Sequence, residues 1–169
     1  MMKKYSLQKC GFFIGILSLF SCASEITCDE GPELDIDQTR LEAEIDQIEN
    51  YLEAEGIDYQ THSSGIRYTE IETGQGNNPN FCSNFSADYE GKVLGEQEAF
   101  GSGIGAQFSM RSSELIPGIK IAVSLMNRNA DYRFYIPAQL LINKGISNSV
   151  PASIPADENI DLRIRLTSY

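Results

Sequence analysis

The stretch FGSGIGAQFSMRSSELIPGIKIAVSLM, residues 100–126, joins a short alternating run to a short helical one. In AQFSM (106–110), apolar and polar residues alternate with the period of two that is typical of a half-buried strand. IPG (116–118) opens a helical stretch that runs to about Met126, with proline near the helix start, where its missing N–H is tolerated. The change of period predicts a strand followed by one short, apolar helix.

Further strand patterns flank this stretch on both sides. IRYTEI (66–71) ends at the turn-forming GQGNNP (74–79), and FSADY (85–89) alternates apolar with polar residues. YRFYI (132–136) ends at a proline, and IDLRIRL (160–166) shows the most regular alternation in the chain. Strands that pack on one short helix predict an α+β fold.

Two segments between these patterns are expected as loops. GSGIG (101–105) has glycines spaced as in some phosphate-binding loops, but no Lys-Ser or Lys-Thr pair and no long helix follows it. The sequence therefore predicts a turn there and no nucleotide site. The segment 138–155 is long for a loop in a compact domain, and loops of that length are often functional.

The N-terminus has the order of a secretory signal peptide. Three lysines, at positions 3, 4 and 9, precede an uncharged apolar run over 11–20 that is too short to span a bilayer as a helix. The run ends in LFSC (19–22), which resembles the lipobox of bacterial lipoproteins. We expect residues 1–21 to be removed, lipid on Cys22, and a lipid-anchored protein of the cell envelope, in the periplasm or at the outer membrane. An ordinary signal peptide with a chance cysteine is the alternative.

Residues 22–60 form a strongly acidic arm, with thirteen acidic residues and only Arg40 to oppose them. Residues 22–33 are expected as a tether. Apolar residues at 41, 45, 48 and 52 then form one stripe of an amphipathic helix, which Asp37 can cap at its start and Gly56 can end. Such a helix packs either on its own domain or on another helix. Because the chain carries a net charge of −11, nucleic acid is not an expected partner.

Cysteine and histidine usage gives no sign of metal or nucleophilic chemistry. Cys28 and Cys82 either form a disulfide or remain two unpaired thiols, and the sequence leaves both open. His62 is the only histidine and lies in a polar stretch, which favours a surface position. No CxxC or other metal-ligand spacing occurs. No cofactor and no metal are expected.

From about Ser64 to Leu166 the chain resembles the FKBP-type peptidyl-prolyl cis-trans isomerases. The matching segments are SGIRY (64–68), GQG (74–76), YEG (89–91), Phe100, Phe108, LIPG (115–118), LM (125–126), IP (136–137), IP (154–155) and the closing strand. The resemblance implies a twisted antiparallel sheet wrapped around one short helix, over residues 61–169, with a pocket between helix and sheet. The acidic helix before it also resembles exported bacterial members of the family.

The resemblance also implies a site and a reaction. The family builds its pocket from positions that here are Tyr89, Phe100, Phe108, Leu115, Ile116 and Leu162. Ile119 and Ile142 fall at further substrate-binding positions, and the backbone N–H of Ile116 is the expected donor to the substrate. Rotation of an X-Pro amide is slow because it breaks amide resonance, and an apolar pocket favours the twisted amide over the planar one. The expected partners are proline-containing polypeptide segments.

Four positions depart from the family pattern. Gly101 stands where an aspartate is usual, and Ala106 where an aromatic residue precedes Phe108 by two. Ile119 replaces the indole at the pocket floor, and Ile142 falls at or beside a tyrosine position. Two functions are therefore expected to compete. The first is a prolyl isomerase of reduced activity that acts on exported proteins, and the second is a non-catalytic module that binds a peptide or partner at the same cleft.

Overall fold

A computed structural model describes residues 27–141, 154–155 and 157–169 of the chain. The signal segment 1–21, Cys22 and Ile142 lie outside the described residues. Six strands form one antiparallel sheet in the order β1-β2-β5-β6-β3-β4. Their bounds are β1 Gln60–Thr61, β2 Arg67–Glu72, β3 Asn84–Val93, β4 Ala99–Ser109, β5 Asp131–Ile136 and β6 Ile160–Ser168.

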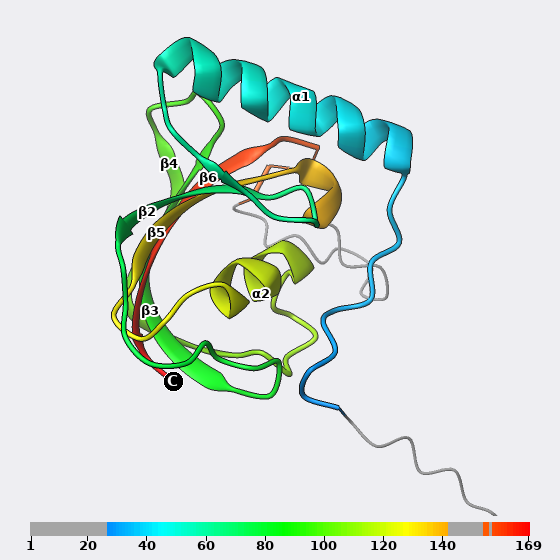
Figure 1. Ribbon diagram of the computed structural model, residues 1–169. Coiled ribbons are helices and arrows are strands. Elements are labelled where there is room, and N and C mark those ends of the chain that lie inside the picture. Colours follow the sequence, from blue (N-terminus) through cyan, green and yellow to red (C-terminus); the bar gives the residue numbers. More distant parts are fainter. Residues whose placement is uncertain (1–26, 142–153, 156) are drawn as a thin grey trace, which may run out of the picture.

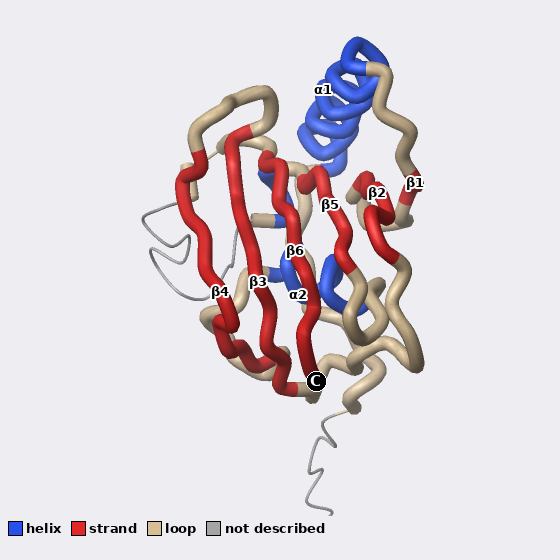
Figure 2. Tube along the Cα trace, turned by 90° about the vertical axis from the view of Figure 1, so that its left-hand side faces the viewer, coloured by secondary structure: helices blue, strands red, loops and turns tan. Residues whose placement is uncertain are grey.

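The sheet curves around a single short helix, as the sequence predicted. Helix α2 (Pro117–Ser124) lies inside this curve, and a 3₁₀ turn, η1 (Ala138–Leu140), follows β5 (Figure 1). Helix α1 (Gln38–Glu55) lies across one end of the sheet, and the C-terminus lies at the other (Figures 1 and 2). The prediction of an α+β fold with a twisted antiparallel sheet is confirmed.

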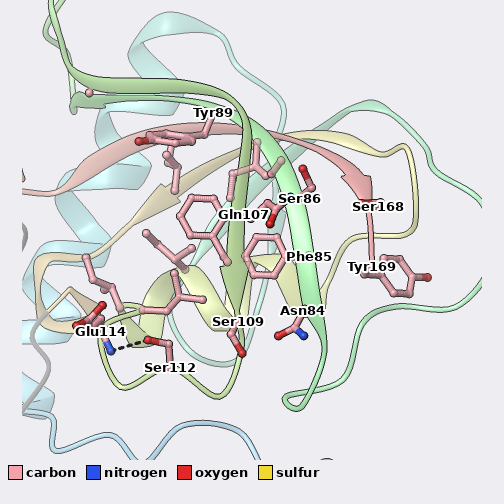
Figure 3. Close-up of a pocket in the computed structure, with 18 of the residues that line it drawn as sticks. Asn84, Phe85, Ser86, Tyr89, Gln107, Ser109, Ser112, Glu114, Ser168 and Tyr169 are labelled. Carbon is pink, nitrogen blue, oxygen red and sulfur yellow. Dashed lines mark hydrogen bonds between the residues drawn. The ribbon is translucent and has the colours of Figure 1, made fainter.

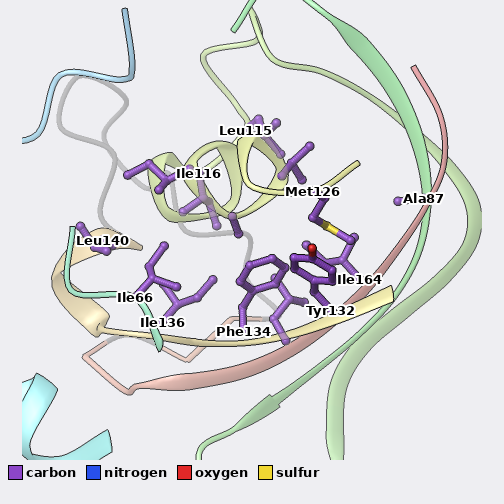
Figure 4. Packing of buried hydrophobic residues seen from close by; sticks show 14 of the residues in the cluster. Ile66, Ala87, Leu115, Ile116, Met126, Tyr132, Phe134, Ile136, Leu140 and Ile164 are labelled. Carbon is purple, nitrogen blue, oxygen red and sulfur yellow. The ribbon is translucent and has the colours of Figure 1, made fainter. Parts of the chain in front are cut away.

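The core fills the space between α2 and the concave face of the sheet (Figure 4). Phe134 and Ile136 of β5 are fully buried there, as are Ala122 and Val123 of α2. The helix approaches the sheet closely because position 118 has no side chain: a Cβ at Gly118 would lie 2.8 Å from Cγ2 of Ile136. The glycine of the LIPG segment is therefore a packing requirement of this fold.

The glycine-rich segment 101–105 is part of strand β4, so the prediction of a turn there is wrong. Gly103 pairs with Tyr89 of β3, and a bulge interrupts the register between Ala87 and Tyr89. Gly105 has φ +61°, a conformation that suits glycine at such a bulge. The glycines do not break the strand, because cross-strand pairing with β3 fixes their backbone.

Helix α1 has the predicted bounds and ends. The Asp37 side chain accepts a hydrogen bond from the N–H of Arg40 (3.2 Å), and Gly56 adopts a left-handed conformation. The N–H of Ile57 then donates to the carbonyl of Leu52 (2.9 Å), which closes the last turn. Local capping chemistry was sufficient to predict this helix.

The helix packs on its own domain, which is the first of the two expected arrangements. Ile48 and Leu52 are fully buried and form a second hydrophobic cluster with Tyr135 of β5. The Glu44 carboxylate, also buried, accepts a hydrogen bond from the N–H of Gln139 in η1 (2.8 Å). The apolar stripe of α1 is therefore covered by the domain, through its contact with Tyr135 of β5.

The segment before α1 is attached to the domain, so the prediction of a tether over 22–33 is wrong for its described part. Cys28 forms a disulfide with Cys82, which decides between the two alternatives left open by the sequence. The N–H of Phe81 donates to the carbonyl of Cys28 (3.0 Å), and Leu34 and Ile36 pack against the main core. No helix in the described part of the chain is long and apolar enough to cross a membrane.

Candidate functional site

A groove of about 890 Å³ lies between the N-terminal end of α2 and the concave face of β3, β4 and β6 (Figure 3). Aromatic and aliphatic side chains make up much of its walls, and several polar residues also line it. The lining residues are Asn84, Phe85, Ser86, Ala87, Tyr89, Phe100, Gly101, Gln107, Phe108, Ser109, Ser112, Glu114, Leu115, Ile116, Ile119, Ile154, Leu162, Ile164, Ser168 and Tyr169.

The structure brings the predicted pocket residues together in this groove. The six residues expected to form the catalytic pocket all line it: Tyr89, Phe100, Phe108, Leu115, Ile116 and Leu162. Ile119 also lines it, whereas Ile142 lies outside the described residues. These residues come from three strands and the start of a helix, so only the folded chain assembles them. Their contact with a substrate stays a prediction.

Aromatic rings from β3 and β4 form one wall of the groove. The Phe108 ring stacks on Phe85 with centroids 5.2 Å apart and meets the edge of Tyr89 at 6.0 Å. Phe85 and Phe108 are cross-strand partners, so strand register alone places the first pair. Phe85 is buried, while Tyr89 and Phe108 are half-buried and keep part of their surface open to the groove.

Glycines on β3 and β4 provide the space for two of the wall rings. A Cβ at Gly103 would lie 2.6 Å from Cε1 of Tyr89, and one at Gly91 would lie 2.5 Å from Cζ of Phe100. Any side chain at these positions would displace the rings. The glycine-rich composition of this edge therefore serves the aromatic wall of the groove.

The start of α2 forms the opposite wall. Ile116 precedes the first helical residue, Pro117, and its carbonyl accepts hydrogen bonds from the N–H groups of Ile119 (3.0 Å) and Lys120 (3.1 Å). None of the described residues accepts a hydrogen bond from the N–H of Ile116. This amide group, next to the apolar side chains of the groove, can donate to a carbonyl oxygen of a bound peptide.

The positions that depart from the family pattern differ in their relation to the groove. Gly101 lines it, and a Cβ added there would meet no atom within 4 Å. Ala106 pairs with Ala87 across the sheet and does not line it. Ile119 lines it as an aliphatic wall. The groove therefore has an open place where the family pattern has a carboxylate.

A second aromatic cluster lies beyond the groove, in the core of the sheet. The Tyr68 ring stacks on Tyr132 with centroids 5.9 Å apart, and both approach Phe134. Burial is the main reason that the pKa of Tyr132 rises to about 12, with the nearby Glu70 carboxylate as a further cause. The phenol is therefore neutral at ordinary pH, and this cluster is structural.

Several groove residues were missed by the sequence analysis. Phe85 shares the alternation of Tyr89, so its face could have been inferred from the period of two. Gln107 lies on β4 in the predicted alternating run, but it was not assigned to the groove. Glu114 and Tyr169 carry no local signal, because their place depends on how the β4–α2 turn and the chain end fold against the groove. In the described part of the chain, no three His, Cys, Asp or Glu side chains gather as metal ligands.

His62 is not part of a catalytic arrangement among the described residues. It is half-exposed in the turn before β2, where its Nδ1 lies 2.9 Å from the Ser64 hydroxyl and accepts a hydrogen bond from the Ser64 N–H (3.2 Å). It does not line the groove. The described lining offers no nucleophile–base pair, and its chemistry is that of a desolvated apolar site with a few polar groups.

Comparison with known proteins assigns the chain to a family. The model of the FKBP-type peptidyl-prolyl cis-trans isomerase family matches residues 77–167. The peptidyl-prolyl cis-trans isomerase Mip of Coxiella burnetii is 25% identical over 112 residues, which cover 64% of this chain. The match spans about half of that protein, 46% of its length.

Two solved structures share the fold. A peptidyl-prolyl cis-trans isomerase of Pseudomonas syringae pv. tomato matches with a TM-score of 0.58 at 20% identity, over 80% of this chain and 97% of that one. FkpA of Escherichia coli matches with a TM-score of 0.58 at 18% identity, over 77% and 62% respectively. With the family model over more than half of its residues, the chain belongs to the FKBP-type peptidyl-prolyl cis-trans isomerase family.

Proposed function

We propose that the groove catalyses cis–trans isomerisation of X-Pro bonds in exported polypeptides. The observation that carries this proposal is the position of the Ile116 N–H, which has no acceptor among the described residues, beside an aromatic wall made by Tyr89, Phe100 and Phe108. An apolar cavity with one oriented donor fits a prolyl peptide. No paired nucleophile and general base are found among its described lining residues.

The chemistry follows from the nature of the amide. Rotation about X-Pro is opposed by a barrier of roughly 18–20 kcal/mol, because the planar amide is stabilised by resonance. The twisted amide is less polar and loses less on leaving water. A groove walled by Phe100, Phe108 and Leu162 therefore binds the twisted form better than the planar form, which lowers the barrier. The N–H of Ile116 holds the bound peptide in place by donating to one of its carbonyl oxygens.

The open place at Gly101 favours a second candidate function. Without a carboxylate there, and with an aliphatic Ile119 in the wall, the groove has fewer polar contacts that could strengthen during rotation. Such a groove can bind a peptide equally well in both amide forms, which gives affinity without catalysis. A non-catalytic peptide-binding module is thus the alternative to a slow isomerase.

The test uses a protein whose refolding is limited by a proline isomerisation. We expect the chain, without residues 1–22, to shorten the slow refolding phase in proportion to its concentration. A matched variant, Phe108→Ala, should give much smaller acceleration at equal concentration. Binding of the unfolded substrate without any acceleration would instead favour the binding module.

We also propose that lipid on Cys22 anchors the protein to a membrane of the cell envelope. The support is the signal pattern that ends in LFSC (19–22). Because Cys28 is fixed to Cys82, only six residues would join the lipid to the folded domain, a reach of about 20 Å when extended. Cys22→Ala should abolish lipid labelling in cells, and unchanged labelling would refute the anchor.

A further inference from the structure

The groove is mostly apolar, and few charged groups line it. Among the side chains of the described residues that line it, Glu114 carries the only charge. Tyr169 lies at the opposite end of the groove, with Asn84 and Ser168 nearby (Figure 3). A peptide in the groove would therefore meet one charged side chain, at the end next to α2.

The backbone at Glu114 is held in place. Its N–H donates to the Ser112 hydroxyl (3.1 Å), and the N–H of the following residue, Leu115, donates to the Ser112 carbonyl (3.3 Å). Leu115 and Ile116 are then buried in the groove wall. The carboxylate thus stands two residues before the N–H that we expect to hold the substrate, on a turn of defined conformation.

No described lysine or arginine forms an ion pair with this carboxylate. Glu114 is exposed, and it forms none of the ion pairs found among the described residues. Two acidic residues of β3 that do not line the groove have partners of their own. Asp88 accepts a hydrogen bond from the N–H of Gly105 (2.7 Å), and Glu90 pairs with Lys92 (3.1 Å). Glu114 is therefore the one charged side chain among the described residues that line the groove.

We infer that Glu114 determines substrate specificity by selecting segments in which a lysine or arginine lies close to the proline, and by rejecting acidic ones. This inference rests on the proposed function, because it concerns the same groove. A cation that reaches the exposed carboxylate gains a modest attraction, whereas an acidic side chain there meets repulsion. The two effects add when a basic peptide is compared with an acidic one.

The test compares proline peptides of one sequence that differ only in the residue at each position flanking the X-Pro pair: Lys, Leu or Glu. Isomerisation is measured as kcat/KM, and binding of the same labelled peptides is measured by fluorescence anisotropy. At low ionic strength we expect the Lys peptide to be favoured over the Glu peptide by about threefold to tenfold at one of the flanking positions. High salt should reduce this ratio, because the Debye length falls from about 10 Å at 0.1 M to about 3 Å at 1 M.

Two variants separate the local carboxylate from the charge of the whole chain. Glu114→Gln should remove most of the preference, and Glu114→Lys should reverse it. Glu98→Gln changes the net charge of −11 by the same amount at an exposed residue that does not line the groove, and it should retain the preference. The Leu peptide gives a reference value for each variant, and a change in the folded fraction affects all three peptides alike and so leaves the Lys-to-Glu ratio unchanged.

Each outcome decides the inference. Equal treatment of Lys and Glu peptides by the unmodified chain would overturn it, as would an equal loss of preference in Glu98→Gln and Glu114→Gln. Charge-selective binding without isomerisation would support the role of Glu114 and refute the proposed catalysis. Isomerisation without charge selectivity would support the proposed catalysis and refute the role of Glu114. Failure of every peptide to bind would refute both the catalysis and the role of Glu114.

Discussion

The ring of Tyr89 occupies the space that a side chain at position 103 would fill, since a Cβ on Gly103 would lie 2.6 Å from Cε1 of the tyrosine. The two residues are cross-strand partners on β3 and β4. The orientation of this groove ring therefore depends on a missing side chain on the neighbouring strand.

Gly103→Ala should push the Tyr89 ring out of its position. We expect kcat/KM to fall by roughly tenfold or more, because small displacements of a groove wall spoil its fit to the substrate. The crowding should also lower stability, by about 1–3 kcal/mol. Ser102→Ala, at the exposed neighbouring position, should leave both quantities almost unchanged. Full activity in the Gly103→Ala variant would show that the ring position does not matter.

Gly101→Asp tests the cause of any low activity. The added side chain has open space, and it would restore a polar group at the groove edge. A hydrogen bond in a desolvated site contributes about 1–3 kcal/mol, so we expect kcat/KM to rise at least several-fold. Gly101→Ala provides the matched steric control and should give no rise. An unchanged rate in a folded Gly101→Asp variant would show that the missing carboxylate is not limiting.

The packing of α1 predicts that the helix is part of the folded unit. Ile48 is fully buried against the domain, so Ile48→Ala should lower the free energy of unfolding by about 2–5 kcal/mol in urea denaturation. Glu53→Ala, at an exposed position of the same helix, should change it by less than about 0.5 kcal/mol. If Ile48→Ala proved harmless, the helix would have to pack on a partner in solution.

The disulfide should contribute to stability mainly by restricting the unfolded chain. Its cysteines are 54 residues apart, and a loop of that length corresponds to a stabilisation of about 2–4 kcal/mol. Replacing Cys28 and Cys82 together by serine should lower the free energy of unfolding by this amount, and the urea midpoint should fall with it. Reductant should lower the midpoint of the unmodified chain but not of the double variant. Equal midpoints for both chains without reductant would contradict this account.

Local sequence features predicted the elements that depend on near neighbours. The caps at Asp37 and Gly56 define α1, and Pro117 marks the start of α2, because these signals act within one helical turn. The alternation in 160–166 likewise predicted β6. Resemblance to the family then placed Tyr89, Phe108 and the other wall residues in one groove.

Features that depend on distant parts of the chain could not be predicted in this way. The glycines at 101–105 appear as a turn in isolation, and only pairing with β3 makes them a strand. The pairing of Cys28 with Cys82 requires the arm to lie on the domain, which no local pattern encodes. Glu114 carries no signal either, since its place at the groove depends on the fold of the β4–α2 turn.

The most direct test of the central claim is exchange between the cis and trans forms of a short proline peptide, measured by NMR with the chain at catalytic concentration. We predict that the unmodified protein increases the exchange rate. Phe108→Ala opens the groove wall but keeps the fold, and the increase that it causes should be at least tenfold smaller. Peptide resonances that shift on binding while the exchange rate stays at its uncatalysed value would contradict catalysis in this groove.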